Sequence, residues 1–128
     1  MLAIVKYPGN RAVECQIAGS RAGIAALIGG TSPMRRLEAR IGVDGGEYRF
    51  AMFIREDQKR QRMGNILYKG KILGGPIMAV GTDPEGNIRD LSGPAAEAIR
   101  ARLDELDAVH GPQANLARAM RRKEGAAV

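Results

Sequence analysis

The fold is decided by residues 48–83, which read YRFAMFIREDQKRQRMGNILYKGKILGGPIMAVGTD. At the start of this stretch, Tyr48, Phe50, Met52 and Ile54 recur at every second position, and this period predicts a β-strand. At its end, the apolar run 76–80 lies between glycines and predicts another strand. Between the two strands lies a polar run rich in cations and amides.

Three hairpins extend the pattern on both sides of this stretch. Residues 36–41 alternate like 48–55, and the turn sequence 43–46 joins the two runs. Residues 2–7 and 12–17 predict an N-terminal hairpin, because Pro8-Gly9-Asn10 separates them. After the strand at 76–80, Asp83-Pro84-Glu85-Gly86 predicts a type I turn, and residues 88–91 would return as a strand.

Helical spacing appears in three other places. One helix follows Ser20 and ends at Gly29-Gly30, and another begins at Ser92-Gly93-Pro94 and breaks at His110-Gly111-Pro112. A last helix covers 113–123, whereas 56–63 could form a short exposed helix or an ordered loop. We therefore expect an α+β fold, a small mostly antiparallel sheet built from hairpins and packed against two or three helices. A single domain would span 1–109, followed by a basic C-terminal helix or tail at 110–128.

Composition narrows the class of protein. The chain has 128 residues, twenty Lys and Arg against fourteen Asp and Glu, and a net charge of +6, which favours anionic partners. With five aromatic residues and no Trp, it does not suit nucleic-acid binding by base stacking. The single cysteine, the absence of a long apolar run and the lack of a signal-peptide pattern predict a cytoplasmic protein that does not enter a membrane.

Tests for catalytic and metal-binding motifs are negative. His110 is the only histidine and lies in a Gly-Pro loop, and Cys15 alternates with polar residues in a strand, so neither has a partner for nucleophilic catalysis. One His and one Cys cannot build a zinc site, and the segment GNILYKGKI (64–72) fails the Walker A spacing. We expect a protein that is not an enzyme and needs no metal or cofactor.

The candidate site is the basic run at the centre of the chain. Arginine forks hold phosphates in two hydrogen bonds, amides add neutral donors, and glycines allow close backbone approach. The residues predicted to bind an anionic ligand are Arg55, Lys59, Arg60, Arg62, Asn65, Lys69 and Lys71. The alternative is that this run is only a solvated surface.

The order of features resembles a family catalogued as a domain of unknown function and common in phages, plasmids and their bacterial hosts. The resemblance covers about residues 1–107 and rests on AALIGG (25–30), FIRED (53–57), Gly64-Asn65, KILGGPIMAVGTDPEG (71–86) and DLSGPAAEAI (90–99). This chain has Arg55-Glu56 where the family has an Asn-Glu pair. The resemblance supplies no catalytic residues and implies a mobile-element setting, in which small proteins often bind and block host components.

These observations predict a binding protein for an anionic ligand. A nucleotide is favoured, including a signalling nucleotide withheld from a host defence system. The first alternative is a nucleic-acid-binding module, which would use the same segment and the basic tail. The second is a protein–protein inhibitor whose second hairpin pairs edge to edge with itself or with a host target. Six Met residues, the small size and the free hairpin edges favour a homo-oligomer.

Overall fold

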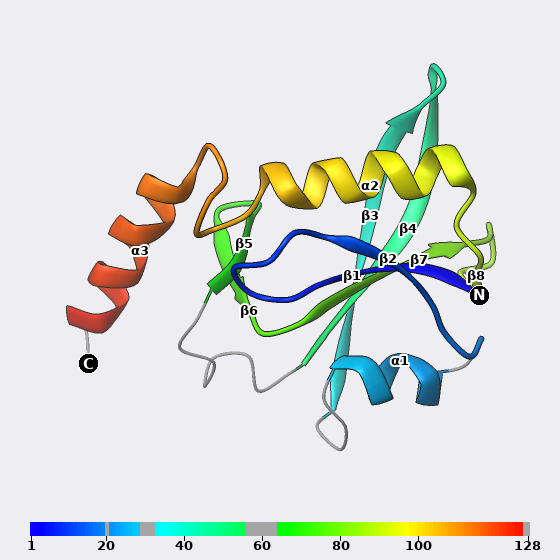
Figure 1. Ribbon diagram of the computed structural model, residues 1–128, viewed down its shortest axis with the longest axis horizontal. Coiled ribbons are helices and arrows are strands. Elements are labelled where there is room, and N and C mark those ends of the chain that lie inside the picture. The colour runs from blue at the N-terminus through cyan, green and yellow to red at the C-terminus, as the bar shows by residue number, and fades with distance from the viewer. Residues whose placement is uncertain (20, 29–32, 56–63, 127–128) are drawn as a thin grey trace.

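A computed structural model describes residues 1–19, 21–28, 33–55 and 64–126. It confirms the α+β fold: an antiparallel six-stranded sheet packs against helices, and a two-stranded hairpin lies beside it (Figure 1). The strands are β1 Leu2–Lys6, β2 Val13–Gln16, β3 Met34–Val43, β4 Gly46–Arg55, β5 Gly64–Tyr68, β6 Lys71–Gly74, β7 Ile77–Thr82 and β8 Ile88–Arg89. The helices are α1 Arg21–Ile28, α2 Gly93–Glu105 and α3 Ala114–Ala126.

The large sheet has the order β2-β1-β7-β4-β3, and β8 also pairs with β7. The predicted hairpins are confirmed: β1 pairs with β2, β3 with β4, and β7 with β8, all antiparallel. The longest is β3–β4, which turns at Asp44 and Gly45, both in the left-handed region with φ of 50° and 78°. This order leaves β2 and β3 as the two edges and places β7 among the central strands.

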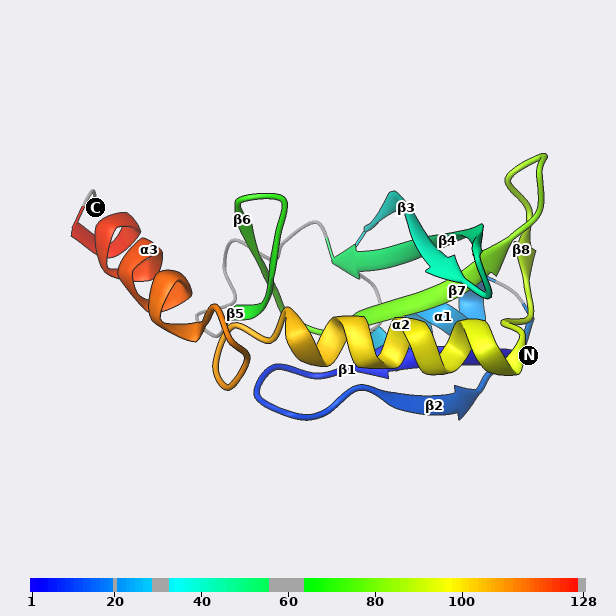
Figure 2. The ribbon, with the colours of Figure 1, turned by 90° about the horizontal axis from the view of Figure 1, so that it is seen from above.

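Both faces of the sheet are covered, since α2 and α1 lie on opposite sides of the strands (Figures 1 and 2). On the α2 face, Phe50 and Met52 belong to a buried cluster with Ile99 of α2. On the α1 face, Phe53 belongs to a second cluster with Ile24 of α1. Alternate side chains along β4 therefore enter two different apolar cores, one on each face of the sheet. In a sheet covered on one side only, every second side chain would face solvent instead.

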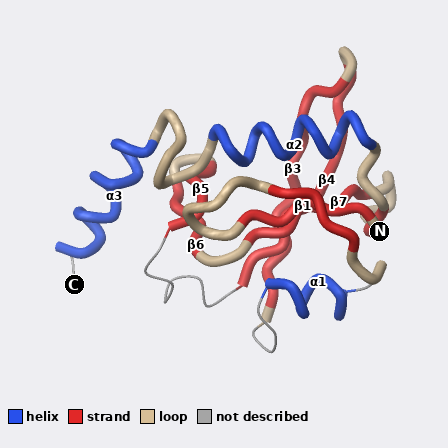
Figure 3. Tube along the Cα trace, viewed as in Figure 1, coloured by secondary structure: helices blue, strands red, loops and turns tan. Residues whose placement is uncertain are grey.

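The second helix begins where the sequence predicts. Ser92 is its N-cap, with the backbone N–H of Ala95 donating to Ser92 Oγ at 3.2 Å, and Pro94 occupies the first turn. The last helix, α3, projects from the body of the molecule (Figure 3). The predicted domain boundary at residue 110 falls in the connection between α2 and α3.

The hairpin β5–β6 was not expected. Residues 65–71 look mixed in character, but Lys69 and Gly70 form a two-residue turn with φ of 48° and 77° between two short strands. A short Lys-Gly turn between apolar pairs is the signal that could have predicted it. The segment 56–63 lies outside the described residues. No helix among the residues that are described is long and apolar enough to cross a bilayer.

Gly81 is a position where the fold requires the absence of a side chain. A Cβ there would lie 2.8 Å from Tyr48 Oη and 2.9 Å from the carbonyl oxygen of Asp90. We expect Gly81→Ala to lower the free energy of unfolding by about 1–3 kcal/mol, because β7 and its neighbours would have to separate. Urea denaturation followed by circular dichroism measures this effect.

Gly42→Ala is the matched control, because a Cβ at Gly42 meets only the carbonyl oxygen of Gly46 at 3.9 Å. Its effect should stay within about 0.5 kcal/mol. Equal effects of the two substitutions would contradict the close packing at Gly81.

Candidate functional site

A groove opens between the α2 face of the sheet, α2 itself and the tip of the β5–β6 hairpin. Its volume is about 520 Å³, within the range of small-molecule sites. The floor is apolar and is contributed by Ala39, Phe50, Met52, Ile99, Leu103 and Leu106. An occupant of this floor would need an apolar or aromatic body.

Cations stand at the border of this groove. Lys69 and Arg102 line it from the hairpin tip and from α2, next to the half-buried Tyr68. The ammonium of Lys69 lies 5.4 Å from the centre of the Tyr68 ring. Arg102 forms an exposed ion pair with Glu105 at 3.3 Å, and such surface pairs contribute only about 0–1 kcal/mol. Arg102 can therefore turn towards a bound anion at little cost.

The edge strand β3 forms another border of the groove. Glu38 and Arg40 from β3, and Arg49 from β4, also line it. Strand alternation directs the side chains of these three residues to the face opposite Phe50 and Met52. A second, more open groove of about 420 Å³ continues along β3 and α2 and shares Arg40 and Arg102 with the first. The seam between β3 and α2 is thus hollowed over much of its length.

The structure separates the residues predicted to bind an anion. Lys69 lines the groove, and Lys71 is exposed on the same hairpin but does not line it. Arg55 ends β4 half-buried, on the face opposite its neighbour Ile54, which belongs to the α2-side core. The remaining three cations, Lys59, Arg60 and Arg62, lie outside the described residues.

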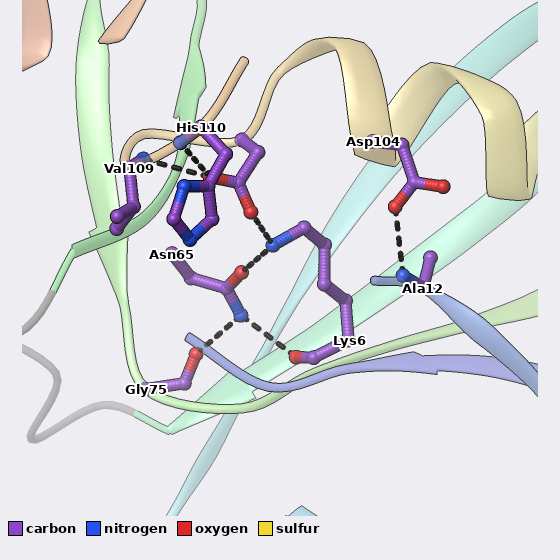
Figure 4. A network of polar contacts seen from close by, with 8 residues as sticks. Lys6, Ala12, Asn65, Gly75, Asp104, Val109 and His110 are labelled. Atoms are coloured by element: carbon purple, nitrogen blue, oxygen red, sulfur yellow. Dashed lines mark hydrogen bonds and ion pairs between the residues drawn. The ribbon is translucent and has the colours of Figure 1, made fainter. Parts of the chain in front are cut away.

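Asn65 is inside the protein, with none of its surface exposed. Its side-chain amide donates to the carbonyl oxygens of Lys6 at 2.7 Å and Gly75 at 2.8 Å, and its Oδ1 accepts from Lys6 Nζ at 2.8 Å (Figure 4). These bonds engage both amide N–H groups and the amide oxygen. Asn65 therefore binds groups of the protein interior and does not line the groove.

Lys6 is the centre of this buried network and is the residue that sequence reasoning missed. Its side chain is fully buried, and Nζ forms an ion pair with Asp107 Oδ2 at 2.5 Å. The backbone N–H groups of Val109 and His110 donate to Asp107 Oδ1 at 2.7 and 2.6 Å. The only sequence signal was a lysine closing the apolar run LAIVK, which also fits a strand that simply ends at the surface.

The pKa of Asp107 lies below the ordinary value for aspartate. Burial by itself would raise this pKa, but the hydrogen bond from Lys6, the two backbone N–H donors and the charge of Lys6 outweigh it. Asp107 is therefore held as a carboxylate, and the positive charge of Lys6 is paired inside the protein.

The network holds the β5–β6 hairpin beside the groove. Asn65 lies on β5, Lys6 ends β1, and Asp107 follows α2, so three distant segments meet. Backbone bonds reinforce this junction: Leu67 N–H donates to the carbonyl oxygen of Leu106, and Ala108 N–H to that of Asn65. Tyr68 and Lys69 directly follow these anchored residues, so their place at the groove depends on the network.

The other reactive side chains lie outside this groove. Cys15 is half-buried in β2, and burial raises the pKa of its thiol. His110 is exposed in the connection after α2, where its backbone N–H donates a hydrogen bond to Asp107 Oδ1. Among the described residues, no three His, Cys, Asp or Glu side chains gather as a metal site would require.

Comparison of the chain with protein-family models, with curated proteins and with solved structures finds no match in any of the three.

Removing either charge of the Lys6–Asp107 pair should lower the free energy of unfolding strongly. Removing both charges together should lower it by less than the sum of the two single effects. Asp107→Asn leaves Lys6 without its counter-charge, and Lys6→Met leaves Asp107 without its own, so each should lower the free energy of unfolding by about 3 kcal/mol. The double variant buries no charge, so a double-mutant cycle by urea denaturation should give a favourable coupling of about 1 kcal/mol or more. Asp44→Asn, in an exposed turn, is the control; strictly additive losses would contradict a direct charge pair.

The stability of the protein should fall at acid pH through Asp107. Because the pKa of Asp107 is lower in the folded state than in the unfolded chain, the unfolded chain binds this proton first as the pH falls. The contribution is complete above the unfolded pKa of about 4 and is lost as the pH falls towards the lower folded pKa. Melting temperatures measured from pH 6 to pH 2 should fall less steeply for Asp107→Asn than for the wild type, whereas parallel curves would contradict this assignment.

Proposed function

We propose that the protein binds an anionic small molecule in the groove between the sheet, α2 and the β5–β6 hairpin, and that a nucleotide is its ligand. The observation that carries the proposal is the combination of an apolar floor with Lys69 and Arg102 at the border of one cavity. The net charge of +6 adds a long-range attraction for anions.

A nucleotide suits both parts of this groove. Its base is a flat, largely apolar body that can lie against the partly buried Tyr68 and Leu106 of the lining, and its phosphates can pair with Lys69 and Arg102. Tyr68 supplies an aromatic ring directly beside the Lys69 ammonium. A wholly polar anion, such as inorganic phosphate, would leave the apolar floor uncovered and should bind more weakly.

Binding without chemical change is the simplest use of these residues. Among the described residues that line the groove, Glu38 is the one with a carboxylate, but strand alternation turns its side chain to the face opposite the groove floor, where its Oε1 accepts from Arg36 Nε at 2.5 Å. The described residues that line the groove include no Ser, Thr, Cys or His to act as nucleophile or base. A protein of this kind would act by withholding its ligand from other proteins.

Isothermal titration with mono-, di- and cyclic nucleotides tests the proposal. At least one should bind, and Lys69→Ala and Arg102→Ala should each raise its Kd about tenfold by removing one charge-assisted contact. Lys71→Ala is the matched control, because Lys71 lies exposed on the same hairpin without lining the groove. Flat heats across the panel would reject nucleotide binding, and equal losses in all three variants would reject this groove as the site.

A further inference from the structure

The outer edge of β3 is a long row of unpaired backbone groups. The strand has ten residues and ends the sheet order, with β4 as its partner on one side. The two-residue turn at Asp44 and Gly45, with positive φ at both, makes Val43 and Gly46 a hydrogen-bonded pair. Along an antiparallel strand, residues whose backbone groups point towards the partner alternate with residues whose groups point away from it. Since the groups of Val43 point towards β4, the backbone N–H and C=O groups that point away from β4 belong to Arg36, Glu38, Arg40 and Gly42. Within the described residues, these groups have no hydrogen-bond partner.

The side chains along this edge alternate in charge on one face and are apolar on the other. On the face turned away from α2, Arg36, Glu38 and Arg40 follow one another, and the Glu38 and Arg40 side chains are 66% and 62% exposed. On the α2 face, the partly buried Leu37 and Ile41 flank Ala39. A strand that adds to this edge must therefore match a charge pattern and an apolar pattern together.

A second copy of β3 matches both patterns in one register. When two β3 strands run antiparallel about a two-fold axis at Ala39, Glu38 lies opposite Arg40 of the second copy, and the symmetry repeats this pair. On the α2 face the same register sets Leu37 opposite Ile41 of the second copy, again twice. The outward backbone groups of Glu38 and Arg40 also meet as hydrogen-bonded pairs.

The neighbouring symmetric registers fit worse. A two-fold axis at Glu38 would place the two Glu38 carboxylates opposite each other and Arg36 opposite Arg40, so that like charges face across the seam. An axis at Leu37 would pair Arg36 with Glu38 but would set Ala39 opposite the exposed Arg35. The axis at Ala39 alone pairs opposite charges on one face and apolar side chains on the other.

We infer that two copies of this chain associate through β3 in the Ala39-centred register, which joins their sheets into one. The two-fold axis stands normal to the sheet, so both α2 helices lie on the same side of the joined sheet. Since Glu38 and Arg40 also border the groove, the second copy would run along its open side. The association needs no ligand and stands whether or not the groove binds a nucleotide.

Sedimentation equilibrium of the full chain tests the association over about a hundredfold range of concentration. The wild type should form a dimer, and Glu38→Arg or Arg40→Glu should each raise the dimer Kd about tenfold or more by turning two attractive pairs into repulsive ones. The double variant Glu38→Arg/Arg40→Glu restores opposite charges across the seam and should return the Kd to within about threefold of the wild type. Glu97→Arg, the same charge change on the exposed face of α2, is the control and should leave the Kd unchanged.

Single cysteines in a Cys15→Ser background test the register directly. Only a residue on the two-fold axis meets its own copy, and such a pair at Ala39 would have Cα atoms about 4.5 Å apart, within disulfide range. Ala39→Cys should therefore form a covalent dimer under mild oxidation, and Leu37→Cys and Glu38→Cys should not. Crosslinking at residue 37 or 38 instead of 39 would overturn the register, and a wild type that stays monomeric throughout would overturn the association.

Discussion

The buried charge of Lys6 is the constraint on which the arrangement around the groove depends. An ammonium without a counter-charge inside a protein is strongly unfavourable, so Lys6 can be buried only while Asp107 and Asn65 face it. Asn65 lies on β5, and Asp107 lies in the segment after α2. The requirement to satisfy one charge therefore ties the end of β1, the small hairpin and the end of α2 together, and the backbone bonds of Leu67 and Ala108 lie at the same junction.

The sheet adds a second constraint through its two covered faces. Central strands such as β7 bury both sides, so their side chains serve two apolar clusters and leave little room for polar function. Polar side chains and open grooves occur instead where this covering stops: at the seam between β3 and α2, at the tip of the β5–β6 hairpin and at the free edge of β3. The proposed ligand groove and the proposed contact between copies both lie there, and Glu38 and Arg40 belong to each.

The cationic run that looks like one site in the sequence is divided in space. Lys69 reaches the groove, Lys71 stays on the outside of the same hairpin, and Asn65 is turned inward. The second cation at the groove, Arg102, comes from α2, more than thirty positions further along the chain. Charge density along the sequence therefore does not identify the set of side chains that line one cavity.

Local patterns along the chain were enough to predict the α+β class, the β1–β2 and β3–β4 hairpins, the turn before β8 and the start of α2 at Ser92. These features depend on side-chain period, turn residues and capping, all of which act between residues close in the chain. Three other features follow from long-range packing: Lys6 is a core residue, Asn65 accepts a hydrogen bond from it, and Arg102 lies beside the same groove as Lys69. The reason is physical: whether a polar side chain is solvated, paired or aimed at a ligand depends on which distant segment packs against it, and that depends on the whole arrangement of strands and helices.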